Sequence, residues 1–224
     1  MKNITNFLLM LGSITLMNCS DDDFEMFPSD AVTYKVTFNL NWNGTDFPTD
    51  YPSNAHFSKL IGWSHQSSST FFQPGTLASA GIENMAEAGG TSPLDDELQA
   101  KIEAGEGLDR VIGSGLGETG VGSISVEIVV HKDHPSVTLA TMLAPSPDWY
   151  AAVVGALLYE NGNYVSNKTM DLLVYDAGTD SGATFTSDDV ETSPQAAISM
   201  IVDAPLGNGT VITPAIGTVV FEKL

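Results

Sequence analysis

Apolar and polar residues alternate along much of the chain, which is the pattern of half-buried β-strands. In residues 32–42 every second side chain is apolar, so one face of this segment is expected to be buried. Asn161-Gly162 lies between two apolar runs and indicates a hairpin. About eight strand-like runs separated by turn-rich segments predict an all-β, antiparallel eight-stranded β-sandwich rather than an alternating α/β fold. The runs span residues 32–42, 55–65, 123–130, 137–142, 153–159, 170–175, 196–202 and 218–222.

A different periodicity occupies the middle of the chain. In residues 77–88 apolar side chains recur at helical spacing, which places Glu83 and Glu87 on the outward face. Residues 92–102 carry a second apolar stripe with the same spacing. Residues 105–122 are rich in glycine and read as a connector without the signature of a phosphate-binding loop. The β-sandwich is therefore expected to contain one short inserted helical segment.

Composition narrows the function classes. The chain has 224 residues, of which 42% are hydrophobic, so one domain with a sizeable core is expected. It carries 28 acidic against 8 basic residues and a net charge of −20. This charge argues against nucleic acid as a partner and against unaided binding to anionic lipid. It fits an extracellular protein or a cation-binding protein, although a solubilising acidic surface explains most of the charges by itself.

The first residues have the features of a bacterial lipoprotein signal. Lys2 precedes a short apolar run at residues 7–16, and Cys19, the only cysteine in the chain, follows it. The run is too short to span a bilayer, and the thiol after it is the group that becomes lipidated in such proteins. An acidic stretch at residues 21–25 comes next. The predicted organisation is a signal peptide at residues 1–18, an acidic tether at 19–31 and a single domain at 32–224.

These N-terminal features predict a location. The acidic stretch after Cys19 resembles the surface-export signal of some outer-membrane lipoproteins. An outer membrane lipoprotein exposed at the cell surface is therefore expected, with membrane contact only through the lipid anchor on Cys19. A flexible acidic tether explains the same residues without an export role.

Three aspartates lie in turns at the ends of apolar runs. Asp148 follows the run 137–143, whereas Asp176 and Asp180 follow the run 170–175. Turns of this kind gather at one end of a β-sandwich, where carboxylates repel one another unless a cation lies between them. Carboxylate oxygens are ligands that Ca²⁺ prefers, and neither turn contains the Cys or His of a soft-metal site. On the residues alone, aspartates that only cap turns explain the pattern equally well.

Several segments together carry a family resemblance. Ala-Pro-Ser-Pro-Asp-Trp at 144–149, Asp-Ala-Gly-Thr-Asp-Ser-Gly at 176–182, the segment 56–65 and the helical segment 78–89 occur in the order and approximate spacing of the spondin N-terminal domain family. This module occurs in the extracellular matrix proteins F-spondin and mindin. The resemblance covers roughly residues 32–222, which is nearly the whole predicted domain.

The resemblance has implications for the fold and the site. It implies an eight-stranded sandwich similar to calcium-dependent lipid-binding modules, with a calcium ion at one loop end. The family's calcium-ligand aspartates map onto Asp148, Asp176 and Asp180, while further ligands from backbone carbonyls or water stay unassigned. The chain departs from the animal members in lacking their cysteines and in its lipoprotein-like N-terminus.

Histidines are weaker candidates for a site. His131 and His134 flank Lys132 and Asp133 between two expected strands, which favours a solvated turn over a metal clip. His56 and His65 are expected to be hydrogen-bonding residues of the strand region rather than ligands.

Two function classes follow. The first, favoured here, is a non-enzymatic, calcium-binding surface module for adhesion or for binding an extracellular glycan or protein ligand. The alternative is a secreted metal-dependent hydrolase acting on carbohydrate or lipid. Against it, the sequence shows no Glu or His beside the aspartates to serve as a tuned acid or base, and no nucleophile elbow. A single calcium ion would also keep all three aspartates ionised.

Overall fold

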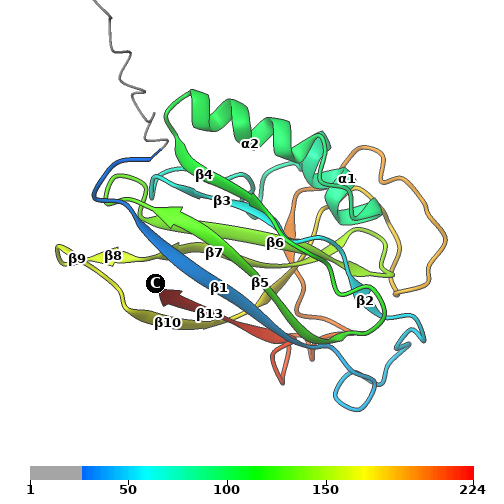
Figure 1. The fold of residues 1–224 in the computed structure, drawn as a ribbon. Helices are drawn as coiled ribbons and strands as arrows, with labels where there is room; N and C mark the ends of the chain where they lie inside the picture. Colours follow the sequence, from blue (N-terminus) through cyan, green and yellow to red (C-terminus); the bar gives the residue numbers. More distant parts are fainter. Residues whose placement is uncertain (1–26) are drawn as a thin grey trace, which may run out of the picture.

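The structure is a computed structural model that describes residues 27–224. Two antiparallel β-sheets pack face to face, and two helices cover the outer face of the second sheet (Figure 1). The expected signal peptide, the lipidation predicted at Cys19 and most of the predicted tether lie outside the described residues. Within residues 27–224 no helix has the length and apolar character needed to cross a membrane.

The first sheet contains the clearest alternating segment of the sequence. Its central strand β1 (Val32–Asn41) pairs with β13 on one side and β5 on the other. Val36 and Phe38 of β1 are fully buried and lie opposite Val126 and Ile124 of β5, as the alternation requires. The sheet order is β10 (Asn167–Asp171), β13 (Gly217–Lys223), β1 and β5 (Val121–Val130).

The second sheet has a centre that is buried on both faces. Every residue of β6 (Ser136–Ala144) is buried, because the first sheet covers one face and the helices cover the other. This explains why residues 137–142 form an apolar run without alternation. The sheet order is β12 (Ser199–Met200), β11 (Leu173–Asp176), β7 (Trp149–Leu157), β6, β3 (Ile61–His65) and β4 (Gly107–Ile112), with β2 (His56–Phe57) also paired to β6.

The helical segment forms the third layer. Helix α1 (Ala80–Ala88) and helix α2 (Leu94–Glu103) bury Ile82, Met85 and Leu98 against the second sheet. Gly81 allows the two helices to approach, since a Cβ there would lie 2.6 Å from the Cα of Leu94. The antiparallel β-sandwich with a short helical insertion is thus confirmed.

The structure contains strands that the sequence pattern did not predict. The glycine-rich connector includes β4, which pairs with β3 along its length. Gly107 lies against the Trp63 ring, and its missing side chain is what makes room for that contact.

Strand β7 begins at Trp149, four residues before the expected start at residue 153. The predicted Asn-Gly hairpin is present as the two-residue strands β8 (Tyr159–Glu160) and β9 (Asn163–Tyr164).

The second sheet has two chemically different ends. At one end lie the β6–β7 turn and the loop that follows β11, close to α1. At the other end lie the C-terminus of β3, the start of β6 and the C-terminus of β7. The nine residues of β6 separate the two ends by roughly 25–30 Å at about 3.3 Å per residue. Figure 1 shows the long loops after β11, coloured from yellow to orange, gathered at the first of these ends.

Candidate functional site

The structure brings the three predicted aspartates to the same end of the second sheet. Asp148 lies in the β6–β7 turn, Asp176 ends β11, and Asp180 follows four residues later. The backbone N–H of Ala177 donates to the backbone carbonyl of Asp148 at 3.1 Å. The indole Nε1 of Trp149 donates to Oδ2 of Asp176 at 3.3 Å. The two loops are therefore in direct contact.

Asp148 organises the loop that carries the other two aspartates. Its Oδ2 accepts from the backbone N–H of Thr179 at 2.7 Å, from that of Asp180 at 3.2 Å and from the Thr179 hydroxyl at 3.2 Å. Its Oδ1 is fully buried, and no hydrogen bond reaches it from residues 27–224. A buried carboxylate oxygen without a partner is costly, and a cation is one group that satisfies it.

Asp176 and Asp180 each cap a local turn. Oδ1 of Asp176 accepts from the Gly178 N–H at 2.8 Å, and Oδ1 of Asp180 accepts from the Gly182 N–H at 2.6 Å. Gly178 has a φ of +76°, and a Cβ there would lie 2.4 Å from the carbonyl oxygen of Ala196. The turn-capping role open at the sequence level is therefore realised for these two residues, whereas the bonds of Asp148 reach residues 31 and 32 positions away.

The electrostatics of the site disfavour negative charge. Burial raises the pKa of Asp148, and its hydrogen bonds from Thr179 and Asp180 offset part of that rise. Burial and the nearby Asp148 raise the pKa of Asp176 to about 6. No ion pair among residues 27–224 includes Asp148, Asp176 or Asp180. The described protein supplies no cationic side chain to compensate these carboxylates.

Two further acids belong to the same end, and the sequence pattern did not identify them. Glu87 of α1 and Asp189 line a small cavity of about 120 Å³ together with Asp180. Burial raises the pKa of Glu87, and the negative charges of Glu83, Asp148 and Asp189 contribute to the rise. Helical spacing placed Glu87 on the outward face, and the structure adds that Glu87 is half-buried there, because the loops lie beside α1. The expectation that no Glu lies beside the aspartates is wrong for the same reason.

The donor chemistry of these residues fits a hard cation. Ca²⁺ binds about six to eight oxygens from carboxylates, carbonyls and water, and Asp148 presents one unpartnered buried oxygen. A coordination shell is not pre-formed, however: in the described part of the chain no three Asp, Glu, His or Cys side chains are grouped closely enough to hold a metal directly. Asp176 and Asp180 point their Oδ1 atoms at their own turns instead.

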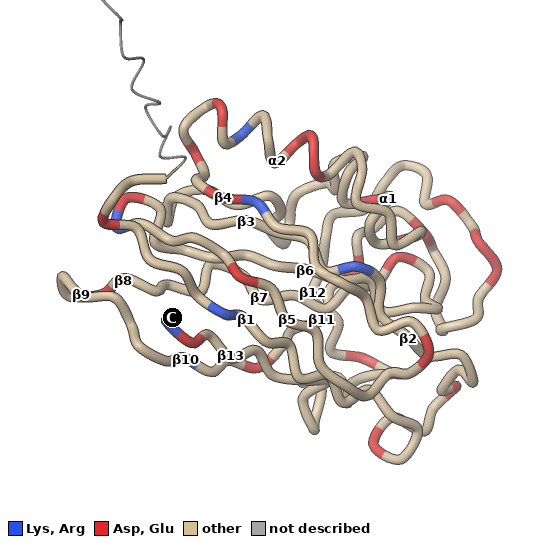
Figure 2. Tube along the Cα trace, viewed as in Figure 1, with Lys and Arg blue, Asp and Glu red and all other residues tan. Residues whose placement is uncertain are grey.

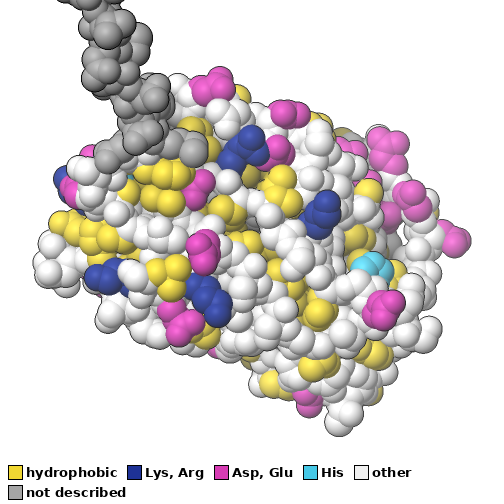
Figure 3. Space-filling model, in the orientation of Figure 1, with side chains coloured by type: hydrophobic (Ala, Val, Ile, Leu, Met, Phe, Trp, Pro, Cys, Tyr) yellow, Lys and Arg dark blue, Asp and Glu magenta, His cyan; other side chains and the backbone are white. Residues whose placement is uncertain are grey.

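Charge is distributed unevenly over the molecule. Residues 80–100, 145–149 and 177–198 contain no Lys or Arg. In Figure 2 the loop that follows β11 accordingly carries acidic positions only. On the face drawn in Figure 3, acidic side chains gather at the end that carries α1 and these loops. A cation approaching this end meets attraction from several carboxylates at once.

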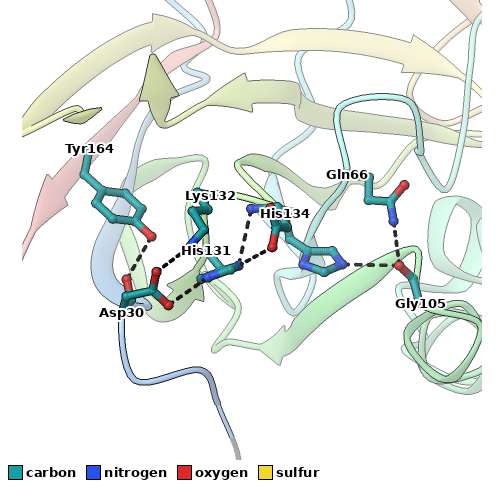
Figure 4. Close-up of polar contacts among 8 residues, drawn as sticks. Asp30, Gln66, Gly105, His131, Lys132, His134 and Tyr164 are labelled. Atoms are coloured by element: carbon teal, nitrogen blue, oxygen red, sulfur yellow. Dashed lines mark hydrogen bonds and ion pairs between the residues drawn. The ribbon is translucent and has the colours of Figure 1, made fainter. Parts of the chain in front are cut away.

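The histidines take structural positions. His65 is buried and bonds Thr138 and the carbonyl of Gln66, as expected for a hydrogen-bonding residue. His131 is also buried, which differs from the solvated turn that the sequence favoured. Figure 4 shows why: its Nε2 lies 2.9 Å from Oδ1 of Asp30, which also pairs with Lys132. These contacts fix the chain just before β1 to the β5–β6 turn.

Comparison with known proteins gives consistent matches. The family model described as Spondin_N matches residues 32–206. Spondin-2 from Rattus norvegicus is 33% identical over 171 residues, and spondin-2 from Homo sapiens is 33% identical over 174 residues. Spondin-1 from Rattus norvegicus is 31% identical over 175 residues.

These matches cover similar parts of the chain and different shares of the relatives. They span 75%, 76% and 75% of this chain, respectively. The chain spans about half of each spondin-2, 52% and 53%, and 21% of the spondin-1.

Proposed function

Because the chain belongs to the spondin N-terminal domain family, we propose that it is a non-enzymatic adhesion or ligand-binding module that works outside the cell and binds calcium. The matches to spondins support the adhesion-type role and the extracellular or cell-surface location. The buried, unpartnered Oδ1 of Asp148 among carboxylates with raised pKa values is the observation that supports calcium.

Calcium would act on the two loops rather than on a reaction. Asp148, Asp176 and Asp180 would hold the ion, which supplies positive charge and links oxygens from both loops. The hydrogen bonds from Thr179 and Asp180 already hold the loops together around Asp148. The ion would then lower the free energy of that arrangement, so the loops present one fixed surface to a ligand.

Thermal melting across a calcium titration tests this proposal. At about a hundred times its dissociation constant, Ca²⁺ should add roughly 2.7 kcal/mol to the unfolding free energy, which corresponds to a Tm increase of about 5–10 °C. Asp148→Asn, Asp176→Asn and Asp180→Asn should each weaken the response, because each replaces a charged oxygen by a neutral one. Mg²⁺ should substitute poorly, since it needs a tighter octahedral shell.

A matched control uses an aspartate away from the site. Asp50 is exposed and adopts a φ of +52°, which Asn tolerates, so Asp50→Asn should keep the full calcium response. A wild-type Tm that stays constant as Ca²⁺ is added would show that the aspartates are turn residues only.

The hydrolase alternative is favoured by one observation, the presence of Glu87 beside Asp148. The cavity there is only about 120 Å³, whereas small-molecule sites usually enclose about 300–1,000 Å³. We therefore expect no turnover of glycoside, ester or peptide substrates. Turnover that Asp148→Ala abolishes would replace the adhesion proposal by an enzymatic one.

The anchor at Cys19 is part of the same proposal. Lipidation there would hold the domain at the outer membrane through residues 19–31. Cell fractionation should then find Cys19→Ser released from membranes or unprocessed, and an unchanged membrane fraction would refute the anchor.

A further inference from the structure

A second cleft lies at the end of the second sheet away from the carboxylates. It encloses about 390 Å³, within the usual range of small-molecule sites. Its walls come from the C-terminus of β3, the start of β6, the C-terminus of β7 and the loop at residues 66–74. Neither the three aspartates nor the acids beside them contribute to it.

The cleft is uncharged in a strongly acidic protein. No Asp, Glu, Lys or Arg lines it, although 28 acidic residues occur in the sequence. Most of the lining is hydroxylated or apolar instead. The hydroxyl groups are those of Ser67, Ser68, Ser69, Thr70 and Ser136.

The hydrogen bonds of His65, the titratable residue of the lining, suit a neutral ring. Its Nδ1 lies 2.8 Å from the carbonyl of Gln66, which only accepts, so Nδ1 carries the proton. Its Nε2 lies 2.9 Å from the Thr138 hydroxyl, which accepts in turn from the Gly155 N–H at 2.9 Å. Donation from the Thr138 hydroxyl to Nε2 gives the hydroxyl proton an acceptor and completes this pattern with a neutral ring. Burial also lowers the pKa of His65, consistent with a neutral ring.

Several polar side chains at the cleft have no hydrogen-bond partner in the described part of the chain. Within residues 27–224 no hydrogen bond engages the side chains of Ser68, Ser69 or Gln73, all of which line the cleft. The loop beneath them is nevertheless held in place. The Thr70 hydroxyl donates to the carbonyl of Phe72 at 2.7 Å, and Ser67 bonds Ser136 at 3.1 Å. The side chains of Ser68, Ser69 and Gln73 thus offer hydrogen-bond donors and acceptors from a loop whose backbone is held in place.

Apolar surface adjoins these polar groups. Phe72, Val154 and Leu157 also line the cleft, and Phe72 is held by ring contacts with Tyr150 and Tyr175. Neutral hydrogen-bonding groups beside an aliphatic and aromatic wall match a molecule with many hydroxyl groups and apolar C–H faces. An anionic ligand would find no basic side chain here and would be repelled by the net charge of −20.

We propose that this cleft binds a neutral saccharide through Ser68, Ser69 and Gln73, with the sugar ring against Phe72 and Leu157. The inference rests on the binding role proposed above and names the ligand class of the module. The saccharide site lies at the end of the sheet opposite the carboxylates and is separate from the loops that calcium would order, so saccharide binding is independent of calcium.

The probe is an array of neutral oligosaccharides and of oligosaccharides that carry uronic or sialic acid, applied to the full chain. Neutral glycans should bind, and anionic ones should not. The affinity for the best neutral glycan, measured by calorimetry, should be equal in calcium and in chelator.

Two matched variants locate the binding. Ser68 and Ser53 are both exposed loop serines without side-chain hydrogen bonds to residues 27–224. Ser68→Trp should fill the cleft and weaken the affinity at least tenfold, whereas Ser53→Trp should change it less than twofold. The double variant Ser69→Ala/Gln73→Ala removes hydrogen-bonding groups without adding bulk, so it should weaken binding even if Ser68→Trp folds poorly.

The outcomes separate this inference from the proposed function. Absence of binding to every neutral glycan, or equal affinity of wild type and both cleft variants, overturns the inference. Saccharide binding that is lost in chelator and in Asp148→Asn also overturns it, because the ligand then belongs to the carboxylate end and the calcium-binding module stands. Saccharide binding without any calcium effect on Tm supports the cleft and contradicts the calcium proposal instead.

Discussion

The second sheet carries two different polar sites, one at the end with the carboxylates and one at the end with the neutral cleft. At the carboxylate end, Asp148 holds a loop through one oxygen and leaves the other unpartnered, with like charges nearby. At the cleft end, the Thr138 hydroxyl bonds both His65 and the Gly155 N–H, so these three buried groups are paired without charge. In the proposed function a cation completes the first arrangement, whereas Thr138 in the second finds its partners within the protein. The stability of the two ends should therefore respond differently to calcium, to an added side chain and to pH.

The largest difference is expected when the central residue of each end is removed. Asp148→Ala deletes the acceptor of three hydrogen bonds and should lower the unfolding free energy by roughly 2–4 kcal/mol in calcium. The loss should be smaller in chelator, because the variant also removes a buried charge. Thr138→Val leaves the Gly155 N–H and His65 unpaired and should cost about 1–3 kcal/mol under both conditions. Urea denaturation with calcium and with chelator measures both variants, and a calcium-dependent loss for Thr138→Val would contradict the comparison.

One glycine at each end of the sheet allows the cost of an added Cβ to be compared between the two ends. Gly178 and Gly155 have φ values of +76° and +59°, so alanine is strained at both positions. A Cβ at Gly178 would also meet the carbonyl of Ala196 at 2.4 Å, whereas a Cβ at Gly155 would meet nothing within 4 Å. Gly155→Ala should cost about 1 kcal/mol and Gly178→Ala about 2–3 kcal/mol. Equal losses in denaturation would show that the carboxylate loop relaxes freely.

The smallest effect is expected from pH, with opposite signs at the two ends. The pKa of Asp176 is raised from 3.8 to about 6, so its contribution to stability is present below pH 3.8 and is lost as pH rises through 6. The pKa of His65 is lowered from 6.5, so its contribution is present above pH 6.5 and is lost as pH falls through the folded value. Each effect should be at most about 1 kcal/mol after solvent screening.

Hydrogen exchange can follow the two ends separately in chelator. The Thr179 amide donates to Asp148, and the Gly155 amide donates to Thr138. After correction for the intrinsic exchange rate, protection of Thr179 should decrease from pH 4 to 6.5, while protection of Gly155 should increase. Saturating calcium should remove the first trend, because a bound cation lowers the carboxyl pKa values. Parallel trends at both amides would contradict the assignment.

The presence of β1 and α1 could be predicted because the spacing of apolar residues is a local feature of the sequence. The alternation in residues 32–42 and the helical spacing in residues 77–88 both depend on which face is buried. The buried faces of β1 and α1 are those expected, although Leu77 precedes α1 and is exposed. Strand β4 was not predictable in this way. Its pairing depends on Gly107 giving room to Trp63, a contact between residues 44 positions apart.

The site was predictable in part. The chain positions of Asp148, Asp176 and Asp180 after apolar runs indicated loops at one sheet end, and the loops do meet there. Glu87 was missed because helical periodicity shows which face is apolar, but not what lies beside the other face. The cleft was missed because serines in a loop have no spacing signal, and their common neutral environment exists only in three dimensions.

The ion pairs of Asp30 with His131 and Lys132 bear on how the domain would carry mechanical load. With the proposed anchor at Cys19, tension would reach β1 through Asp30, which pairs with Lys132 and His131 just before the strand. Strand β1 itself lies between β5 and β13. Beyond the far end of β1, Trp42 contacts Phe185 of the carboxylate-end loop, with ring centroids 5.0 Å apart. A ligand held by this loop, as in the proposed function, would pull along the strands, so the backbone hydrogen bonds on both sides of β1 would resist in shear and yield together. A force perpendicular to an edge strand would instead break the backbone hydrogen bonds one after another. The direction of the force would therefore set how long the domain stays folded while a ligand is bound.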